Sequence, residues 1–312
     1  MWRRTDGVAL LYPGKIHAIN AESESGKTWM ALSICAEVML EGEQVFFIDF
    51  EDSPASVVGR LVDLGVPVDV VEVCFHYIRP DDPLTDSLSE TLVAALVDVG
   101  ASLAVVDGVT EAMVLHGFSI KDNDDAARFI ALLLRPLQRT GATVLVLDHV
   151  TKANESGNRF AIGAQHKLAG IDGAVYTAKV EQPYGRGRTG TSRLEVAKDR
   201  PGHVRAVAGS GKHIGTFRLV SEGGALRAEV VPAAGGDSAV RLSPELLTKV
   251  SDLIAEKAPV SQTGLVKAAG GNAAAVRAAA DHLVKIGCAE ERAGSRNARL
   301  FSHLKFYEGA DR

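Results

Sequence analysis

Apolar runs alternate with amphipathic stretches through the first half of the chain. The runs are rich in β-branched and aromatic residues, as buried strands are, and they lie at Lys15–Asn20, Gln44–Phe50, about Phe75–Ile78, Ser102–Asp107 and Thr143–Asp148. Apolar residues recur at helical spacing in the segments Lys27–Leu40, Pro54 to about Leu64, about Ser87–Val99 and about Asp124–Arg139. A long polar and mixed loop is expected directly after Asp107. Strands that alternate with helices predict an α/β fold with a mainly parallel sheet.

The pattern changes after Ile171. Short strand-like segments joined by glycine turns follow, and we expect them to extend the sheet as antiparallel strands: Gly173–Val180, Ser192–Lys198, Val204–Val207, Thr216–Val220 and Ala225–Val231. A stretch of small residues at 232–242 predicts a linker between a large domain, 1–231, and a small one, 243–312. The small domain contains three helical segments and a strand pair, the pattern of a winged helix-turn-helix.

The composition is that of a soluble globular protein, because 46% of the 312 residues are hydrophobic and 23% are charged. No apolar run is long enough for a membrane span or a signal peptide, so we expect no membrane contact. Cys35, Cys74 and Cys288 are far apart and form no CxxC pair, which predicts a reducing, cytoplasmic location. The net charge of −5 gives no overall attraction to nucleic acid, so such contacts must come from local basic patches.

A phosphate-binding motif follows the first predicted strand. Residues Ala21–Thr28, AESESGKT, match GxxxxGK[ST] except at the first glycine, where the chain has alanine. Such a loop points backbone N–H groups at phosphate oxygens in front of a helix N-terminus. We expect Lys27 to reach the β- and γ-phosphates of ATP and Thr28 to hold Mg²⁺. The predicted cofactors are therefore ATP and Mg²⁺.

The full set of predicted nucleotide-binding residues is contiguous: Ala21, Glu22, Ser23, Glu24, Ser25, Gly26, Lys27, Thr28 and Trp29. Glu22 and Glu24 are expected to point outward, because their negative carboxylates would be repelled by the negative phosphates. The alternative is a chance turn rich in serine and glycine. The position between a strand and an amphipathic helix favours the nucleotide site.

Three further polar groups follow apolar strands. Asp107 ends one strand, where a carboxylate can hold the Mg²⁺ shell through water. Glu51 follows another and can orient and deprotonate an attacking water, whereas His149 follows a third and can report the γ-phosphate. The alternatives are that Asp107 only caps a strand end, that Glu51 is an acidic loop residue, and that His149 is a lone histidine without a role at a phosphate. Because open α/β sheets bind ligands at the carboxyl ends of their strands, we expect these groups to share one edge.

The order of the motifs resembles the RepA-type plasmid helicases of the RecA-fold superfamily and, more distantly, the ATPase domain of DnaB-type hexameric replicative helicases. The motifs are the phosphate loop, IDFEDSP, AVVDGVTEAM and LVLDHVTKA, and the likeness covers roughly Gly7–Arg205. The segments ESESGKTW and KDRPGH are similar to those of AAA-family ATPases from actinobacteria and their phages. The resemblance implies a RecA-like P-loop NTPase core in which Glu51 is the catalytic carboxylate, Asp107 the metal-side acid and His149 the phosphate sensor.

Lys198 and Arg200, in the segment AKDRPG, resemble the lysine–arginine hairpin that DnaB-like rings insert into a neighbour's ATP site. A cation delivered from another subunit stabilises charge on the γ-phosphoryl group. The resemblance therefore implies catalytic roles for both residues and a homo-oligomeric ring, a hexamer. A solvated basic turn is the alternative. In RepA-type proteins the arginine finger lies nearer the segment that aligns with residues 169–176 of this chain. That segment has no arginine here, so Arg159 is a second candidate.

Two loops and the small domain are candidates for contact with DNA. In RecA-like rings the loops after the Asp107 and His149 strands line the channel, and here they are about 111–122 and 151–165. The second loop has polar side chains suited to the phosphates of single-stranded DNA, Lys152, Asn154, Arg159 and Gln165, with Lys167 beyond it. The tip 184–190 is basic and either contacts nucleic acid or is solvated. The winged helix would offer duplex DNA a recognition helix with Arg277, His282 and Lys285 and a wing with Arg292, Arg296 and Arg299, although many such domains bind only proteins.

These observations predict a DNA-dependent ATPase, a hexameric helicase or translocase in the replication of plasmids, phages or mobile elements. A RecA-like recombinase or loader ATPase, which forms filaments and does not unwind DNA, is one alternative. A nucleotide-gated DNA-binding regulator, in which the winged helix is the effector, is another. Closed rings, open filaments and a sequence-specific footprint would distinguish the three.

Overall fold

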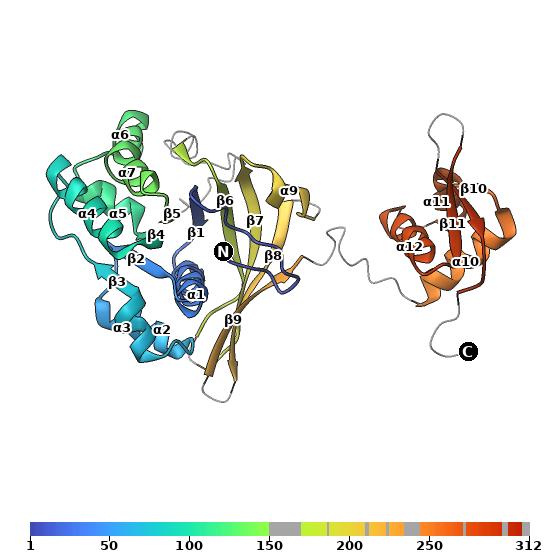
Figure 1. The fold of residues 1–312 in the computed structure, drawn as a ribbon, viewed down its shortest axis with the longest axis horizontal. Coiled ribbons are helices and arrows are strands. Elements are labelled where there is room, and N and C mark those ends of the chain that lie inside the picture. The colour runs from blue at the N-terminus through green and yellow to red at the C-terminus, as the bar shows by residue number, and fades with distance from the viewer. Residues whose placement is uncertain are drawn as a thin grey trace. The chain divides into compact units, whose positions relative to one another are not determined.

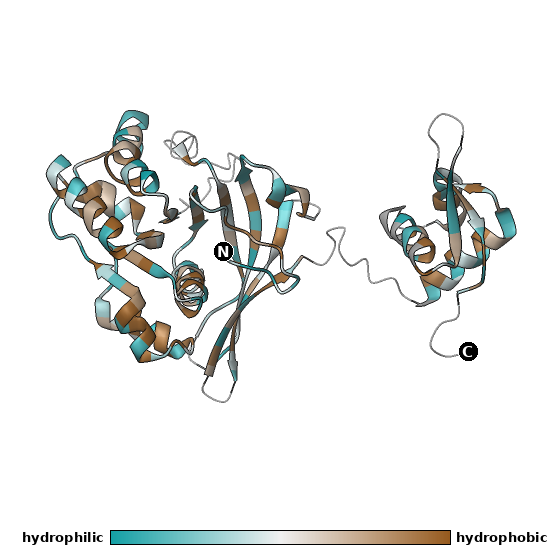
Figure 2. Cartoon of the chain, in the orientation of Figure 1, coloured by the Kyte–Doolittle hydropathy of each residue, from teal (hydrophilic) through white to brown (hydrophobic). Residues whose placement is uncertain are grey.

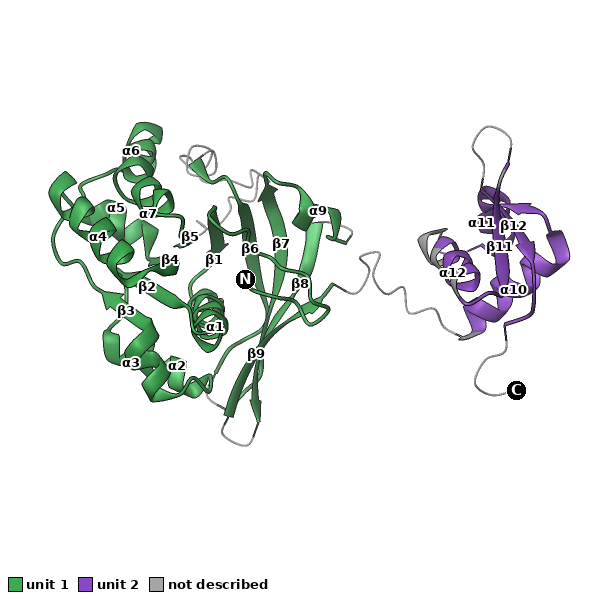
Figure 3. Cartoon of the chain, in the orientation of Figure 1, with its two compact units in different colours: residues 1–233 green, residues 234–312 purple. Residues whose placement is uncertain are grey.

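The computed structural model describes residues 1–149, 170–185, 187–209, 212–222, 225–233, 244–270, 273–294 and 299–307 (Figure 1). The chain divides into two compact units, Met1–Ala233 and Ala234–Arg312 (Figure 3). Each unit has its own hydrophobic core. Among the described residues, no helix has the length and apolar character needed to cross a membrane.

The described part of the first unit contains one nine-stranded sheet with the order β3-β2-β4-β5-β1-β6-β7-β8-β9. The strands from β3 to β6 along this order run parallel, and β6 to β9 pair antiparallel. The strand bounds are Ile16–Ala21 for β1, Gln44–Asp49 for β2, Phe75–Ile78 for β3, Ala101–Asp107 for β4, Thr143–His149 for β5, Ala174–Gln182 for β6, Gly190–Asp199 for β7, His213–Glu222 for β8 and Ala225–Pro232 for β9. The structure is thus α/β with a large, mostly parallel sheet, as the alternating pattern predicts.

Helices cover both faces of the parallel strands (Figures 1 and 2). Successive residues of a strand point to opposite faces, so Val45 and Phe47 lie in one core cluster and Phe46 and Ile48 in the other. The first cluster includes α1 (Lys27–Leu40), α2 (Pro54–Asp63) and α3 (Val68–Cys74). The second includes α4 (Asp86–Val99), α5 (Val109–Leu115), α6 (Asn123–Phe129), the π-helical turn η1 (Ile130–Leu134) and α7 (Arg135–Arg139).

Two predicted segments were wrong. Val204–Val207, expected as a strand, lies mostly in the short helix α9, His203–Ala206. The Asp199 carboxylate accepts the backbone N–H groups of Gly202 and Arg205, at 3.0 and 2.7 Å, and so satisfies the first turn of this helix. The expected long loop after Asp107 begins with α5, in which Val109, Ala112 and Met113 are buried at helical spacing.

The second unit contains three helices, α10 (Pro244–Lys257), α11 (Gln262–Ala269) and α12 (Ala273–Lys285), within its described residues. Its small antiparallel sheet has the order β10-β12-β11, with bounds Val260–Ser261, Arg299–His303 and Ala289–Ala293, respectively. The core of this unit is apolar, with Val250, Ile254, Leu283 and Phe301 almost entirely buried. The helices and the final strand pair follow one another in the order that the sequence predicts.

Candidate functional site

The phosphate-binding motif forms a turn between β1 and α1. Gly26 lies at the N-cap of α1 with φ +81°, and among the described residues no side chain caps this helix end. The free N–H groups of the first turn and the helix dipole are therefore available to bind an anion. Glu22 and Glu24 are exposed, as expected for carboxylates beside a phosphate site. Ala21 is buried inside β1 and pairs with His149, so an alanine fits at this strand position.

Lys27 lies at the centre of a cluster of charged side chains. Its Nζ is 3.3 Å from Oε2 of Glu51 and 3.2 Å from Nε2 of His149. The same His149 nitrogen is 2.9 Å from Oε1 of Glu51. These residues come from α1 and from the chain after β2 and at the end of β5, because the carboxyl ends of parallel strands meet at one edge. The structure therefore brings an ammonium, a carboxylate and an imidazole together in front of the phosphate loop.

Thr28 and Asp107 meet beside this cluster. The Thr28 hydroxyl donates a hydrogen bond of 3.1 Å to Oδ2 of Asp107, whereas Oδ1 of Asp107 is buried with no partner among the described residues. Burial and, to a smaller extent, the negative charge of Glu51 raise the pKa of Asp107 to about 7. A hard divalent cation takes oxygen ligands of this kind and would satisfy the orphan oxygen. The pair fits Mg²⁺, which would supply charge neutralisation at the phosphates.

Replacing Asp107 with asparagine tests this burial through the pH dependence of stability. The folded-state pKa lies above the ordinary value of 3.8, so the wild-type protein loses stability as pH rises from about 4 to about 7. Without metal and nucleotide, Asp107→Asn is expected to melt a few degrees above wild type at pH 8 and close to it at pH 4. Thermal melts at both pH values measure this. A variant that melts below wild type at pH 8 would contradict the raised pKa of Asp107.

Asp49 holds the turn that carries Glu51. Its Oδ1 accepts the backbone N–H groups of Glu51 and Asp52 at 2.8 and 3.0 Å, and its Oδ2 accepts the Tyr77 hydroxyl at 3.0 Å. The Asp49 side chain is fully buried at the end of β2. Asp49 was not predicted as a site residue, because it is the last residue of the strand β2. The only signal was an aspartate two residues before the candidate base, the spacing of an Asx-turn.

Glu111, in α5, brings a second carboxyl group to the cluster. One carboxylate oxygen of Glu51, one of Glu111 and one ring nitrogen of His149 all lie within 4.8 Å of one another. Burial raises the pKa of Glu111, and the charge of Glu51 raises it further. Burial also opposes ionisation of Glu51, but the nearby Lys27 ammonium and the His149 contact hold the pKa of Glu51 below its ordinary value. The two pKa shifts thus favour the ionised form of Glu51 over that of Glu111, as a general base requires.

A cavity of about 1520 Å³ joins these groups to a wall formed by the antiparallel strands. The phosphate loop, Glu51, Asp107 and His149 line one part of it. Trp29 and Arg60 line another, and the Arg60 guanidinium lies 5.6 Å from the centre of the Trp29 ring. The remaining wall comes from β6–β9 and includes Tyr184, Leu219 and Leu226. The uncapped start of α1, the cationic Lys27 and the oxygens of Thr28 and Asp107 therefore share one large cleft.

Residues 7–155 match the family model of an AAA domain. The match includes the phosphate loop and the three strand-end residues Glu51, Asp107 and His149. An AAA domain indicates ATP binding and ATPase activity, which agrees with the cleft just described. No curated protein matches the chain.

Lys198 and Arg200 lie away from this cleft. Asp199 lies between them and pairs with Ala174 at the start of β6. Ala21, where the phosphate loop begins, pairs with Ala178, which is about 13 Å further along β6. Their segment is a strand-to-helix junction between β7 and α9, which corrects the expectation of a hairpin. Within one subunit these cations cannot reach the phosphate loop. Several other candidates lie outside the described residues, namely Lys152, Asn154, Arg159, Gln165, Lys167 and Arg296.

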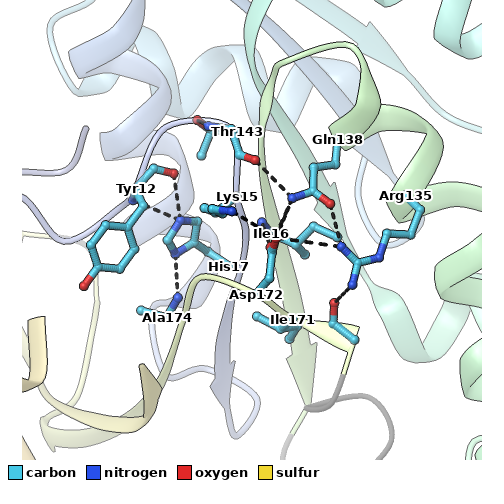
Figure 4. A network of polar contacts seen from close by, with 12 residues as sticks. Tyr12, Lys15, Ile16, His17, Arg135, Gln138, Thr143, Ile171, Asp172 and Ala174 are labelled. Carbon is cyan, nitrogen blue, oxygen red and sulfur yellow. Dashed lines mark hydrogen bonds and ion pairs between the residues drawn. The ribbon is translucent and has the colours of Figure 1, made fainter. Parts of the chain in front are cut away.

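Asp172 is the centre of a polar network beside the start of β1 (Figure 4). Asp172 accepts the backbone N–H of Ile16 at 2.9 Å and the Gln138 amide at 2.9 and 3.1 Å. The Lys15 ammonium and Arg135 guanidinium also approach Asp172, at 3.5 and 3.8 Å. Lys198 donates to the Ile171 carbonyl at 2.7 Å. The network thus fixes the amino-terminal edge of the parallel sheet.

Proposed function

We propose that this chain is a DNA-dependent ATPase that assembles into a hexameric ring and acts as a helicase or translocase in plasmid, phage or mobile-element replication. The observation that carries the proposal is the separation of Lys198 and Arg200 from the phosphate loop of their own subunit. In a ring, successive subunits meet head to tail, so a cation at one edge can face the ATP site at the opposite edge of its neighbour. Hydrolysis would then require assembly.

The RepA-type and DnaB-type resemblance supports this reading. It includes the parallel core, the strand-end residues Glu51, Asp107 and His149, and the position of Arg200 after them. Among the described residues lining the cleft, the cationic side chains are Lys27 and Arg60, and Arg60 pairs with Asp52 at 3.0 Å. A further cation from a neighbouring subunit would neutralise charge developing on the γ-phosphoryl group.

The second unit is proposed to be a winged-helix domain that contacts duplex DNA. Arg277 on α12 is exposed, and Arg292 on β11 is largely exposed beside Glu290. Arg299, however, is bound by the carboxylates of Glu291 and Asp281 at 2.5 and 2.6 Å. Its charge is therefore compensated, and contact with DNA phosphates would depend on Arg277 and Arg292 more than on Arg299.

The ATPase rate with and without single-stranded DNA, measured beside mass photometry, tests the proposal. We expect a hexamer in the presence of nucleotide and a rate that rises several-fold when single-stranded DNA is added. Strand displacement absent under all conditions, despite brisk ATP turnover, would count against a helicase. Open filaments in electron micrographs of the ATP-bound protein would favour the recombinase or loader alternative.

A mixing experiment tests the proposed role of Arg200 across the interface. Arg200→Ala and Lys27→Ala subunits are each expected to be nearly inactive alone. In a random mixture, about one site in four combines an intact Lys27 with an intact Arg200 from the neighbour, so about a quarter of wild-type turnover should return. Arg227→Ala, which removes an exposed arginine on β9, is the control and should keep full activity. A mixture no more active than its components would exclude Arg200 from this role.

A further inference from the structure

Tyr184, just after β6, packs directly against the phosphate loop. A Cβ atom added to Gly26 would lie 2.5 Å from Cζ of Tyr184, and one added to Gly190 would lie 2.3 Å from its Cδ1. Both distances are far below contact distance, so the ring fits only because the loop and β7 each present a glycine to it. The aromatic ring is therefore held between the last turn of the loop and the neighbouring strand.

The hydroxyl of Tyr184 continues the contact by a chain of hydrogen bonds. It donates to Oγ of Ser192 at 2.9 Å, and the Ser192 hydroxyl donates to the backbone carbonyl of Ser25 at 2.9 Å. Ser192 is fully buried in β7, and burial raises the pKa of Tyr184 to about 12, so the phenol stays protonated and able to donate. Consecutive hydrogen bonds of the same polarity strengthen one another. The chain thus fixes the carbonyl immediately before Gly26.

The phosphate loop has few supports of its own. Glu24 has φ +61° and Gly26 has φ +81°, and both lie in the left-handed region that is costly for the glutamate. Glu22, Ser23 and Glu24 are exposed. Holding a backbone in one conformation has an entropic cost, and this cost does not reduce the affinity when the loop is already ordered before binding. A contact that orders Ser25 and Gly26 in advance therefore favours nucleotide binding.

We propose that Tyr184 is a positioning residue of the phosphate loop, whose ring against Gly26 and whose hydroxyl, through Ser192, hold the loop in the conformation that receives the triphosphate. The inference rests on the proposed ATP-binding function. It also gives the antiparallel strands a role. In the sheet, β6 and β7 lie on the side of β1 opposite β2, the strand that precedes Glu51, and they support the loop from that side. A purely structural tyrosine would stabilise the fold and leave nucleotide affinity unchanged.

The test compares Tyr184→Ala and Tyr184→Phe in the full chain. Calorimetric titration with Mg·ATP should show about tenfold weaker binding for Tyr184→Ala and about threefold for Tyr184→Phe, which keeps the ring. Turnover at saturating ATP should stay within about threefold of wild type, because Tyr184 acts through the loop and not on the reacting atoms. Tyr307→Ala removes a tyrosine packed on the core of the second unit and should leave affinity unchanged.

Hydrogen–deuterium exchange of the nucleotide-free protein provides a readout that does not depend on ATP. Backbone amides of residues 23–28 should exchange faster in Tyr184→Ala than in wild type, with Tyr307→Ala unchanged. Should Tyr184→Ala fail to fold, Ser192→Ala, which breaks the same hydrogen-bond chain, carries both measurements. Unchanged affinity and unchanged loop exchange would overturn the proposal. A wild-type protein that binds no Mg·ATP would instead contradict the proposed function, and the exchange comparison would still decide the role of Tyr184.

Discussion

Replacing Lys27 with alanine is expected to weaken the binding of Mg·ATP by about thirtyfold or more. The Lys27 side chain is almost fully buried at the start of α1, and its ammonium lies among Glu51 and His149 in front of the phosphate loop. Removing one partner of a buried, hydrogen-bonded charge pair costs about 2–5 kcal/mol, which corresponds to this loss. Calorimetric titration of the variant with Mg·ATP measures the effect directly.

Lys121→Ala is the matched control for this prediction. It also removes a lysine ammonium, but from an exposed residue just before α6, so its affinity for Mg·ATP should equal that of wild type. Circular dichroism should show that Lys27→Ala remains folded, because the substitution removes no large apolar side chain. Wild-type affinity in folded Lys27→Ala would show that the β- and γ-phosphates do not lie at this loop.

Glu51→Gln is expected to lower turnover by about a hundredfold to a thousandfold while binding of Mg·ATP stays close to wild type. The substitution keeps the shape of the side chain, but an amide cannot accept the proton of the attacking water. The contacts with Lys27 and His149 place the carboxylate at the edge of the cleft and keep it ionised. Steady-state ATPase rates and equilibrium titrations, measured on the same preparation, separate the two effects.

Glu72→Gln, an exposed glutamate on α3, is the corresponding control and should turn over ATP at the wild-type rate. A Glu51→Gln protein with unchanged turnover would remove Glu51 from the role of base. In that case Glu111, whose carboxyl group lies within 4.8 Å of the same cluster, becomes the next candidate. Equal losses of affinity and turnover would indicate a binding role for Glu51.

The fold of the parallel core could be predicted because its strands are buried on both faces. Runs such as QVFFID and TVLVLDH are typical of such strands, and the structure places β2 and β5 within two residues of the expected bounds. Segment 204–207 could not be predicted, since its helical form depends on Asp199 accepting the amides of Gly202 and Arg205. The same holds for α5, where burial against the second core overrides a locally mixed pattern.

The candidate site divides in the same way. Lys27 and Thr28 could be predicted from a local motif, and Glu51, Asp107 and His149 from their positions after buried strands, where topology alone brings them together. Asp49 offered only the local spacing of an Asx-turn before Glu51, whereas Glu111 and Tyr184 could not be predicted. Their contacts join segments that are distant in the sequence, such as Tyr184 with Gly26 across the β1–β6 pair. Only the three-dimensional arrangement reveals these partners.

Titration of purified wild-type protein with Mg·ATP, with Lys27→Ala beside it, shows whether this cleft binds a triphosphate. We expect saturable binding of one nucleotide per chain, abolished when magnesium is chelated and strongly weakened in the lysine variant. Heat signals indistinguishable from buffer for the folded wild-type protein would contradict the claim that this cleft receives a triphosphate.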